Sequence, residues 1–179
     1  MAVFKLVFIM FLSACGGSNM SENRSECNSS MDSLWESMAL IKSSFGYKIN
    51  EIDDRRHEMD SVLQWLKFAN AKDINPEIRT QILQYNSVYR VYKGFVPIYK
   101  NNVLRAEELF YQIKALDKQV KAGVFDKDLP SFGKEYRRIM KEITELKTNV
   151  DETLGKLNAV EPTYRRIAGP VEDFAETVH

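Results

Sequence analysis

The sequence predicts an all-α protein that folds as an elongated antiparallel up-down-up three-helix bundle of the coiled-coil type. Apolar residues recur at alternating spacings of three and four along most of the 179 residues. This heptad pattern is typical of helices that pack against one another lengthwise. Two short polar segments interrupt the pattern, and each is compatible with a tight reversal of the chain. We therefore expect three long helices joined by two turns.

The first helix is expected over residues 31–69. Its heptad positions are apolar except for Lys48 and Arg55, and the register continues without a slip. The positions are Met31, Leu34, Met38, Ile41, Phe45, Lys48, Ile52, Arg55, Met59, Val62, Leu66 and Ala69. The pattern predicts one uninterrupted helix.

The second helix is expected to follow a break over residues 70–75. Asn75-Pro76-Glu77 is a strong helix start, with a capping side chain, a proline at the first position and an acid in the first turn. The heptad positions are Ile78, Ile82, Tyr85, Tyr89, Tyr92, Val96, Tyr99, Val103, Ala106, Phe110, Ile113, Asp117 and Val120. Because the register crosses Pro97 unbroken, we expect one helix kinked near that residue.

The third helix is expected after a turn over residues 122–128, with Pro130 near its start. Its heptad positions are Phe132, Tyr136, Ile139, Ile143, Leu146, Val150, Thr153, Leu157 and Val160. The register continues through Tyr164, Ile167, Val171, Phe174 and Val178. Pro162 and Pro170 interrupt that extension, which predicts either a bent helix or a break followed by a short docked segment.

A short apolar segment opens the chain. Lys5 supplies a positive charge, residues 6–12 are apolar, and the segment closes with Leu12-Ser13-Ala14-Cys15. It is too short to span a bilayer, which needs ~20 apolar residues in a helix, and it has the layout of an export signal. This segment resembles the signal peptide of bacterial lipoproteins, whose Leu-small-small-Cys ending is called the lipobox. An ordinary secretory signal with an incidental Cys15 is the alternative.

The resemblance implies that residues 1–14 are removed and that Cys15 becomes the lipidated first residue of the mature chain. In this class an Asp after the cysteine commonly retains the protein at the inner membrane, whereas Gly16 favours the outer membrane, on its periplasmic side or at the cell surface. We expect residues 15–27 to form a flexible tether, because Gly, Ser and Asn have little to bury. Residues 28–179 would form the bundle domain, and Cys27 would be either a free thiol or part of an intermolecular disulfide.

Residues that carry chemistry are scarce. His57 lies among charged residues, His179 is the last residue, and no paired-histidine spacing, glycine-rich phosphate loop or nucleophile motif occurs. We therefore expect no metal, no cofactor and no enzymatic activity. The 25 basic and 25 acidic residues balance, which gives no reason to expect nucleic acid as a partner.

The candidate binding residues are mostly aromatic: Arg55, Trp65, Phe68, Tyr85, Tyr89, Tyr92 and Tyr99. The tyrosines either fill the core with their hydroxyls at its edge, or line a groove for a ligand. Folding the three helices back on one another brings Arg55, Tyr92 and Glu161 to one level, which predicts either a small polar cavity or a simple pairing of Arg55 with Glu161. Trp65 is expected at the edge of the core, while Phe68 points outward as part of a partner patch.

These observations favour a non-catalytic, lipid-anchored scaffold or adaptor that binds another envelope or surface protein. The alternative is a carrier or sensor of a small ligand that uses a tyrosine-lined cavity at mid-bundle.

Cells that express the full-length chain and are fed an alkyne-tagged fatty acid should label it, because the Cys15 sulfur is the predicted attachment point. Cys15→Ser should abolish the label, detected in a gel after coupling to a fluorophore. Cys27→Ser is the matched control and should keep it. An unlabelled wild-type chain would exclude the anchor.

Overall fold

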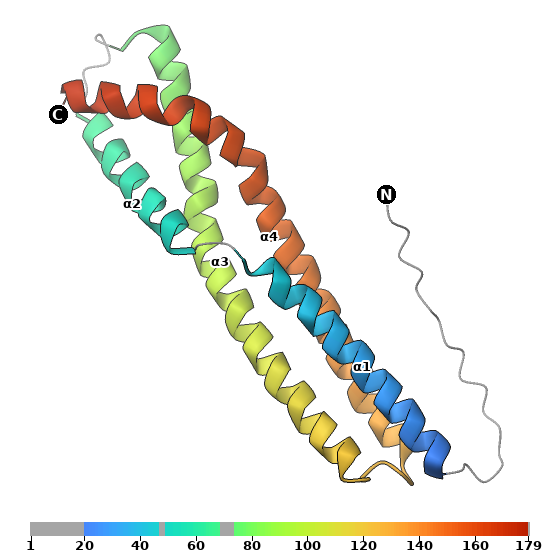
Figure 1. Cartoon of the computed structure of the whole chain (residues 1–179). Coiled ribbons are helices and arrows are strands. Elements are labelled where there is room, and N and C mark those ends of the chain that lie inside the picture. Colours follow the sequence, from blue (N-terminus) through green and yellow to red (C-terminus); the bar gives the residue numbers. More distant parts are fainter. Residues whose placement is uncertain (1–19, 47–48, 69–73, 179) are drawn as a thin grey trace.

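The computed structural model describes residues 20–46, 49–68 and 74–178. Within these ranges the chain forms four helices: α1 (Met20–Ser44), α2 (Ile49–Leu66), α3 (Pro76–Lys121) and α4 (Leu129–Val178). The described chain is therefore all-helical. Helices α3 and α4 pack against each other, and α1 and α2 each pack against both of them (Figure 1). The lipobox and Cys15 lie outside the described residues.

The first predicted helix is wrong in one respect, because the structure divides it into α1 and α2. The hydroxyls of Ser43 and Ser44 donate to the carbonyl oxygen of Leu40, at 2.7 and 3.2 Å, and Gly46 follows the end of α1. Serine bonds of this kind also occur inside α2 and α3, where Ser61 and Ser87 donate to the carbonyl oxygens of His57 and Leu83, whereas glycine is a poor helix former. The heptad register nevertheless continues on the far side of the break.

The beginning of α1 also differs from the expectation of a tether over residues 15–27. Helix α1 starts at Met20, and Asn23 and Cys27 are buried. The Asn23 amide nitrogen donates to the carbonyl oxygen of Asp126 at 3.1 Å, and Arg24 Nη2 donates to that of Lys121 at 3.0 Å. These side chains attach the first turns of α1 to the turn between α3 and α4.

The predicted start of α3 is confirmed. Asn75 is its N-cap and accepts a 2.8 Å hydrogen bond from the amide of Ile78, while Pro76 is the first helical residue. Helix α3 continues as one helix through Pro97. It ends at Lys121, and Gly123 follows in the turn with a φ of 76°, which favours glycine; a Cβ there would lie 2.8 Å from Asp126 Oδ2. The chain then reverses within the predicted turn.

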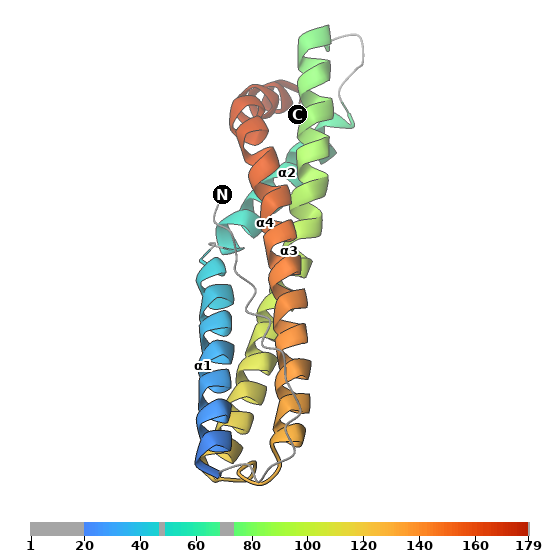
Figure 2. The same ribbon diagram turned by 90° about the vertical axis from the view of Figure 1, so that its right-hand side faces the viewer.

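Helix α4 is one helix that contains both Pro162 and Pro170. Its N-terminus is capped by Asp128, whose Oδ1 accepts from the amide of Ser131 at 3.2 Å. Figures 1 and 2 both show the C-terminal turns of α4 bending away from the direction of its first part. The turn from α3 to α4 and the beginning of α1 lie at one end of the molecule, and the end of α2 and the beginning of α3 lie toward the other.

The core consists of two clusters that meet at the break between α1 and α2. The first cluster joins α1 to the C-terminal half of α3 and the N-terminal half of α4; the second joins α2 to the other halves. Phe45 and Leu154 pack against both clusters. The pair α3–α4 is therefore continuous, while its third partner changes from α1 to α2 halfway along.

Replacing Ile113 by Asp should destabilise the fold by more than about 3 kcal/mol, because it loses a buried apolar side chain and buries an unpaired charge. Ile113 is 0 % exposed in the first cluster. Ile98→Asp is the matched control on the same helix, at a position that is 48 % exposed. We expect it to change the free energy of unfolding by less than about 1 kcal/mol in urea titrations followed by circular dichroism. Equal effects of both variants would contradict the assigned core.

Candidate functional site

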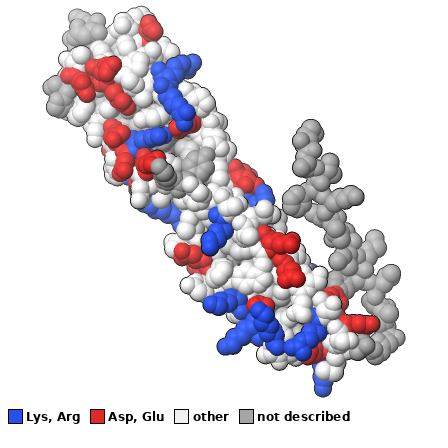
Figure 3. All heavy atoms as spheres, viewed as in Figure 1, with Lys and Arg blue, Asp and Glu red and all other residues white. Residues whose placement is uncertain are grey.

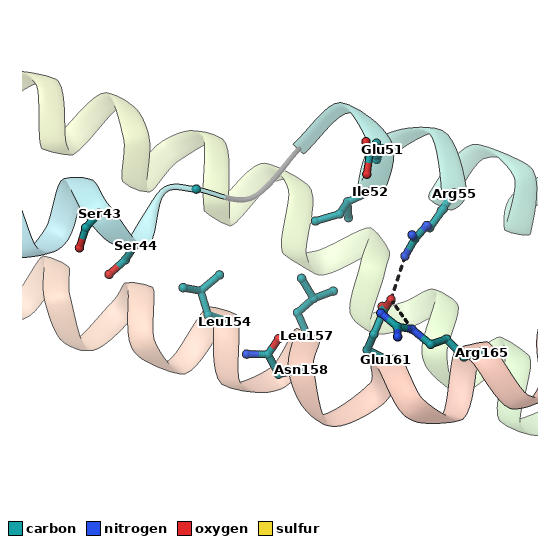
Figure 4. Close-up of a pocket in the computed structure, with 11 residues that line it drawn as sticks. Ser43, Ser44, Glu51, Ile52, Arg55, Leu154, Leu157, Asn158, Glu161 and Arg165 are labelled. Carbon is teal, nitrogen blue, oxygen red and sulfur yellow. Dashed lines mark hydrogen bonds and ion pairs between the residues drawn. The ribbon is translucent and has the colours of Figure 1, made fainter.

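A polar groove opens where α1 ends and α2 begins. It has a volume of about 540 Å³ and lies between these helices and the middle of α4 (Figure 4). The residues that line it are Ser43, Ser44, Gly46, Glu51, Ile52, Arg55, Leu154, Leu157, Asn158, Glu161 and Arg165. The apolar members come from α2 and α4 and belong to or adjoin the second cluster of the core.

The carboxylate of Glu161 organises the polar wall of this groove. Its Oε1 accepts from Arg55 Nη1 at 2.9 Å and from Arg165 Nε at 3.3 Å, and its Oε2 accepts from the hydroxyl of Tyr92. The Arg55 guanidinium also lies over the ring of Tyr164, 5.6 Å from its centroid. One carboxylate therefore links α2, α3 and α4.

The surroundings keep Glu161 ionised. Burial alone would raise its pKa, but the hydrogen bonds from Tyr92 and Arg55 outweigh burial and hold the pKa below its usual range. Burial, followed by the hydrogen bond to Glu161, raises the pKa of Tyr92. The pair is thus a carboxylate and a neutral phenol at physiological pH.

This arrangement offers hydrogen-bond donors to a ligand. Arg165 is 75 % exposed, and Glu161 engages only one nitrogen of its guanidinium, Nε. A guanidinium presents five N–H donors and suits carboxylate or phosphate groups. Within residues 20–46, 49–68 and 74–178, no three His, Cys, Asp or Glu side chains are grouped so that they could hold a metal ion.

The tyrosines that were predicted as candidates to line a groove do not line the polar groove at the break between α1 and α2. Tyr85, Tyr92 and Tyr99 are buried in the second cluster, and Tyr89 packs against it. The hydroxyl of Tyr85 donates to Glu172 at 2.9 Å and that of Tyr89 to Asp60 at 2.6 Å. Buried rings whose hydroxyls reach carboxylates at the edge of the core match the core-filling interpretation.

The two other candidates lie at the end of the molecule where α2 connects to α3. Trp65 is partly buried and packs against the second cluster. Phe68, two residues beyond the end of α2, is 85 % exposed. Of the two, only Phe68 presents most of its ring to solvent.

A second groove was not predicted from the sequence. It has a volume of about 580 Å³ and runs between α1 and α3. Its lining is Trp35, Met38, Ala39, Lys42, Phe45, Val103, Ala106, Glu107, Phe110 and Tyr111. The heptad pattern placed Phe110 in the core, but Phe110 is 40 % exposed, and the neighbouring Leu109 is buried instead.

Charges do not distinguish a binding face on the side of the molecule in Figure 3. Basic and acidic side chains alternate along it, separated by uncharged surface, with Lys and Arg gathered near the end where α1 begins. Such alternation is typical of a solvated helical surface.

No helix in the described part of the chain is both long and apolar enough to cross a membrane. Comparison with known proteins found no matching family model, no similar curated protein and no similar solved structure.

Glu161→Gln should lower the free energy of unfolding by about 1–2 kcal/mol at pH 7, because it removes the charged acceptor of two arginines and a buried tyrosine. The lowered pKa of Glu161 means that its contribution is present above the ordinary pKa of a glutamate and is lost as the pH falls through the folded-state value. The difference between wild type and variant should therefore shrink below about pH 4.3. Urea titrations at several pH values measure it.

Glu145→Gln is the matched control, since Glu145 is 52 % exposed and faces Arg105 and Lys141 at 3.7 and 3.9 Å. Its effect should stay below about 0.5 kcal/mol at every pH. A pH-independent loss in Glu161→Gln would show that the carboxylate's charge is not what stabilises the junction.

Proposed function

We propose that this chain is a non-catalytic, lipid-anchored protein of the bacterial outer membrane, a helical scaffold or adaptor that binds another envelope or surface protein. The anchor is supported by Leu12-Ser13-Ala14-Cys15 and by Gly16 after it. Several acyl chains together hold a protein on a membrane far longer than one chain does. Helix α1 begins at Met20, so the anchor would be only a few residues from the folded body.

The proposal includes the elongated up-down-up architecture, with a kink near Pro97 and bends near Pro162 and Pro170. Helix α3 alone, with 46 residues, would extend ~69 Å at 1.5 Å per residue. An anchor at the beginning of α1 leaves the end of α2 and the beginning of α3 toward the far end of the rod (Figure 1). The rod would hold that end away from the membrane surface.

The exposure of Phe68 at this far end is the observation that carries the proposal. The ring is 85 % exposed, so burial in a partner would remove a large apolar surface from water. Trp65 lies on the last turn of α2 nearby in sequence and adds apolar surface that the core covers only in part.

A carrier or sensor of a small ligand is the second candidate, and the polar groove of Figure 4 favours it. A ligand with a carboxylate or phosphate would bind near Arg55 and Arg165. Saturable thermal stabilisation by fractions of small metabolites, lost in Arg165→Ala, would support this candidate over the adaptor.

The adaptor is tested by capture from intact cells that express the full-length chain with a photoreactive phenylalanine analogue at position 68. We expect a covalent adduct with one protein, because the ring there would be buried in the partner. Phe68→Ala should lower recovery of that protein in affinity capture at least about tenfold, the loss typical of a hot-spot residue. Protease treatment of intact cells separates the periplasmic from the surface setting.

Val124→Ala is the matched control, because Val124 is 57 % exposed but lies in the turn at the other end of the rod. It should leave capture unchanged. Both variants should keep wild-type helicity. Capture that is insensitive to Phe68→Ala, or no adduct at position 68, would overturn the proposal that Phe68 binds the partner.

A further inference from the structure

We infer that the groove between α1 and α3 is filled by the same groove of a second copy of this chain, in a two-fold dimer whose axis runs parallel to the rod. The groove is bordered by aromatic side chains that a monomer leaves in water. Phe110 is 40 % exposed and Tyr111 68 %, and Trp35 meets Phe110 edge-on with ring centroids 5.4 Å apart. Trp, Phe and Tyr are enriched where protein surfaces associate.

The charges in and beside the groove indicate which partner fills it. Exposed Lys42 of α1 and Glu107 of α3 line the groove, and exposed Asp32 and Lys114 lie one turn beyond Trp35 and Tyr111 on the same two helices. In the described part of the chain, none of these four side chains takes part in an ion pair. Each edge therefore has one acid and one base that the monomer leaves unpaired.

The heights of these charged residues along the helix axes make the groove complementary in charge to the same groove of a second copy. The contact between Trp35 and Phe110 fixes a common level on the two helices, which run in opposite directions (Figure 1). With a rise of 1.5 Å per residue, Asp32 and Lys114 lie within about 2 Å of one level. Lys42 lies about 6 Å, one helical turn, beyond Glu107, within reach of a lysine side chain.

A two-fold axis parallel to the rod lays α1 of one copy on α3 of the other at the same level. Asp32 then faces Lys114 of the second copy, and Lys42 faces its Glu107, and symmetry repeats both pairs. A perpendicular axis would instead lay α1 on α1. The parallel axis also leaves the beginnings of both α1 helices at one end, so two lipid anchors would enter one membrane.

That last step rests on the proposed anchor, which also raises the effective concentration of the two copies at a membrane surface. The dimer leaves Phe68 uncovered, because Phe68 lies at the far end of the rod. Dimerisation and capture of a partner would therefore use separate surfaces.

Charge reversal tests the dimer in cells that co-express two full-length copies with different C-terminal tags. Wild-type copies should co-purify. Two Lys42→Glu copies, or two Glu107→Lys copies, should co-purify at least about fivefold less, because each such dimer places like charges together twice. A Lys42→Glu copy with a Glu107→Lys copy should recover wild-type yield, because both pairs are then opposite charges again.

Lys156→Glu, an exposed change on α4, is the matched control and should not alter the yield. Tyr111→Ser tests the apolar part of the interface and should lower the yield; all variants should keep wild-type helicity. Absence of wild-type co-purification, or no recovery in the mixed pair, would overturn the dimer. Such a result combined with persistent capture at Phe68 would leave the proposed adaptor function intact.

Discussion

The continuous packing of α3 on α4 is the interaction on which the rest of the structure depends. Two amphipathic helices of this length cannot bury their apolar stripes on each other alone, so a third helix must cover the seam. The chain supplies that cover in two pieces, α1 for one half and α2 for the other. Because helices in proteins are stabilised mostly by packing of an amphipathic face, each piece depends on its contacts with the α3–α4 pair.

The change from α1 to α2 creates a weak point, and polar groups reinforce it. At the break the cover is incomplete, and the groove of Figure 4 lies there. Glu161 connects Arg55 of α2 with Tyr92 of α3 and with Arg165 on its own helix. The hydrogen bonds from α2 and α3 stabilise the junction beside the apolar contacts of Phe45 and Leu154, and the groove there is lined by polar and charged side chains.

Much of the fold, and the contact between Arg55 and Glu161, could be predicted from the sequence. Asn75-Pro76 located the start of α3, and counting residues along opposed helices brought Arg55 to Glu161. The break after Ser44 could not be predicted, because heptad spacing reports which face is buried and does not report whether the backbone continues. The register crosses the gap intact because α1 and α2 cover the same seam. Gly46, which follows the end of α1, lies between two heptad positions and leaves the spacing unchanged.

The prediction that Phe110 is buried was wrong for a different reason. The buried residues of α3 keep a seven-residue repeat, and its members Tyr85, Tyr92, Tyr99, Ala106, Ile113 and Val120 all lie at predicted positions. The second buried position of each repeat comes three residues later, at Val88, Phe95, Asn102, Leu109 and Leu116, whereas the predicted pattern took the fourth residue, which in one repeat is Phe110. Sequence spacing alone therefore missed the groove between α1 and α3, although it identified the residues near it.

The burial of Cys27 has a consequence for the chemistry of this chain in an oxidising compartment. The thiol is 2 % exposed among the first turns of α1, and burial, together with the nearby Glu26 and Asp126, raises its pKa. Only the thiolate attacks a disulfide. A mixed disulfide therefore requires the first turns of α1 to leave the hydrogen bonds that Asn23 and Arg24 donate to carbonyl oxygens in and beside the α3–α4 turn. The redox state of Cys27 would therefore report how often the first turns of α1 detach from the α3–α4 turn.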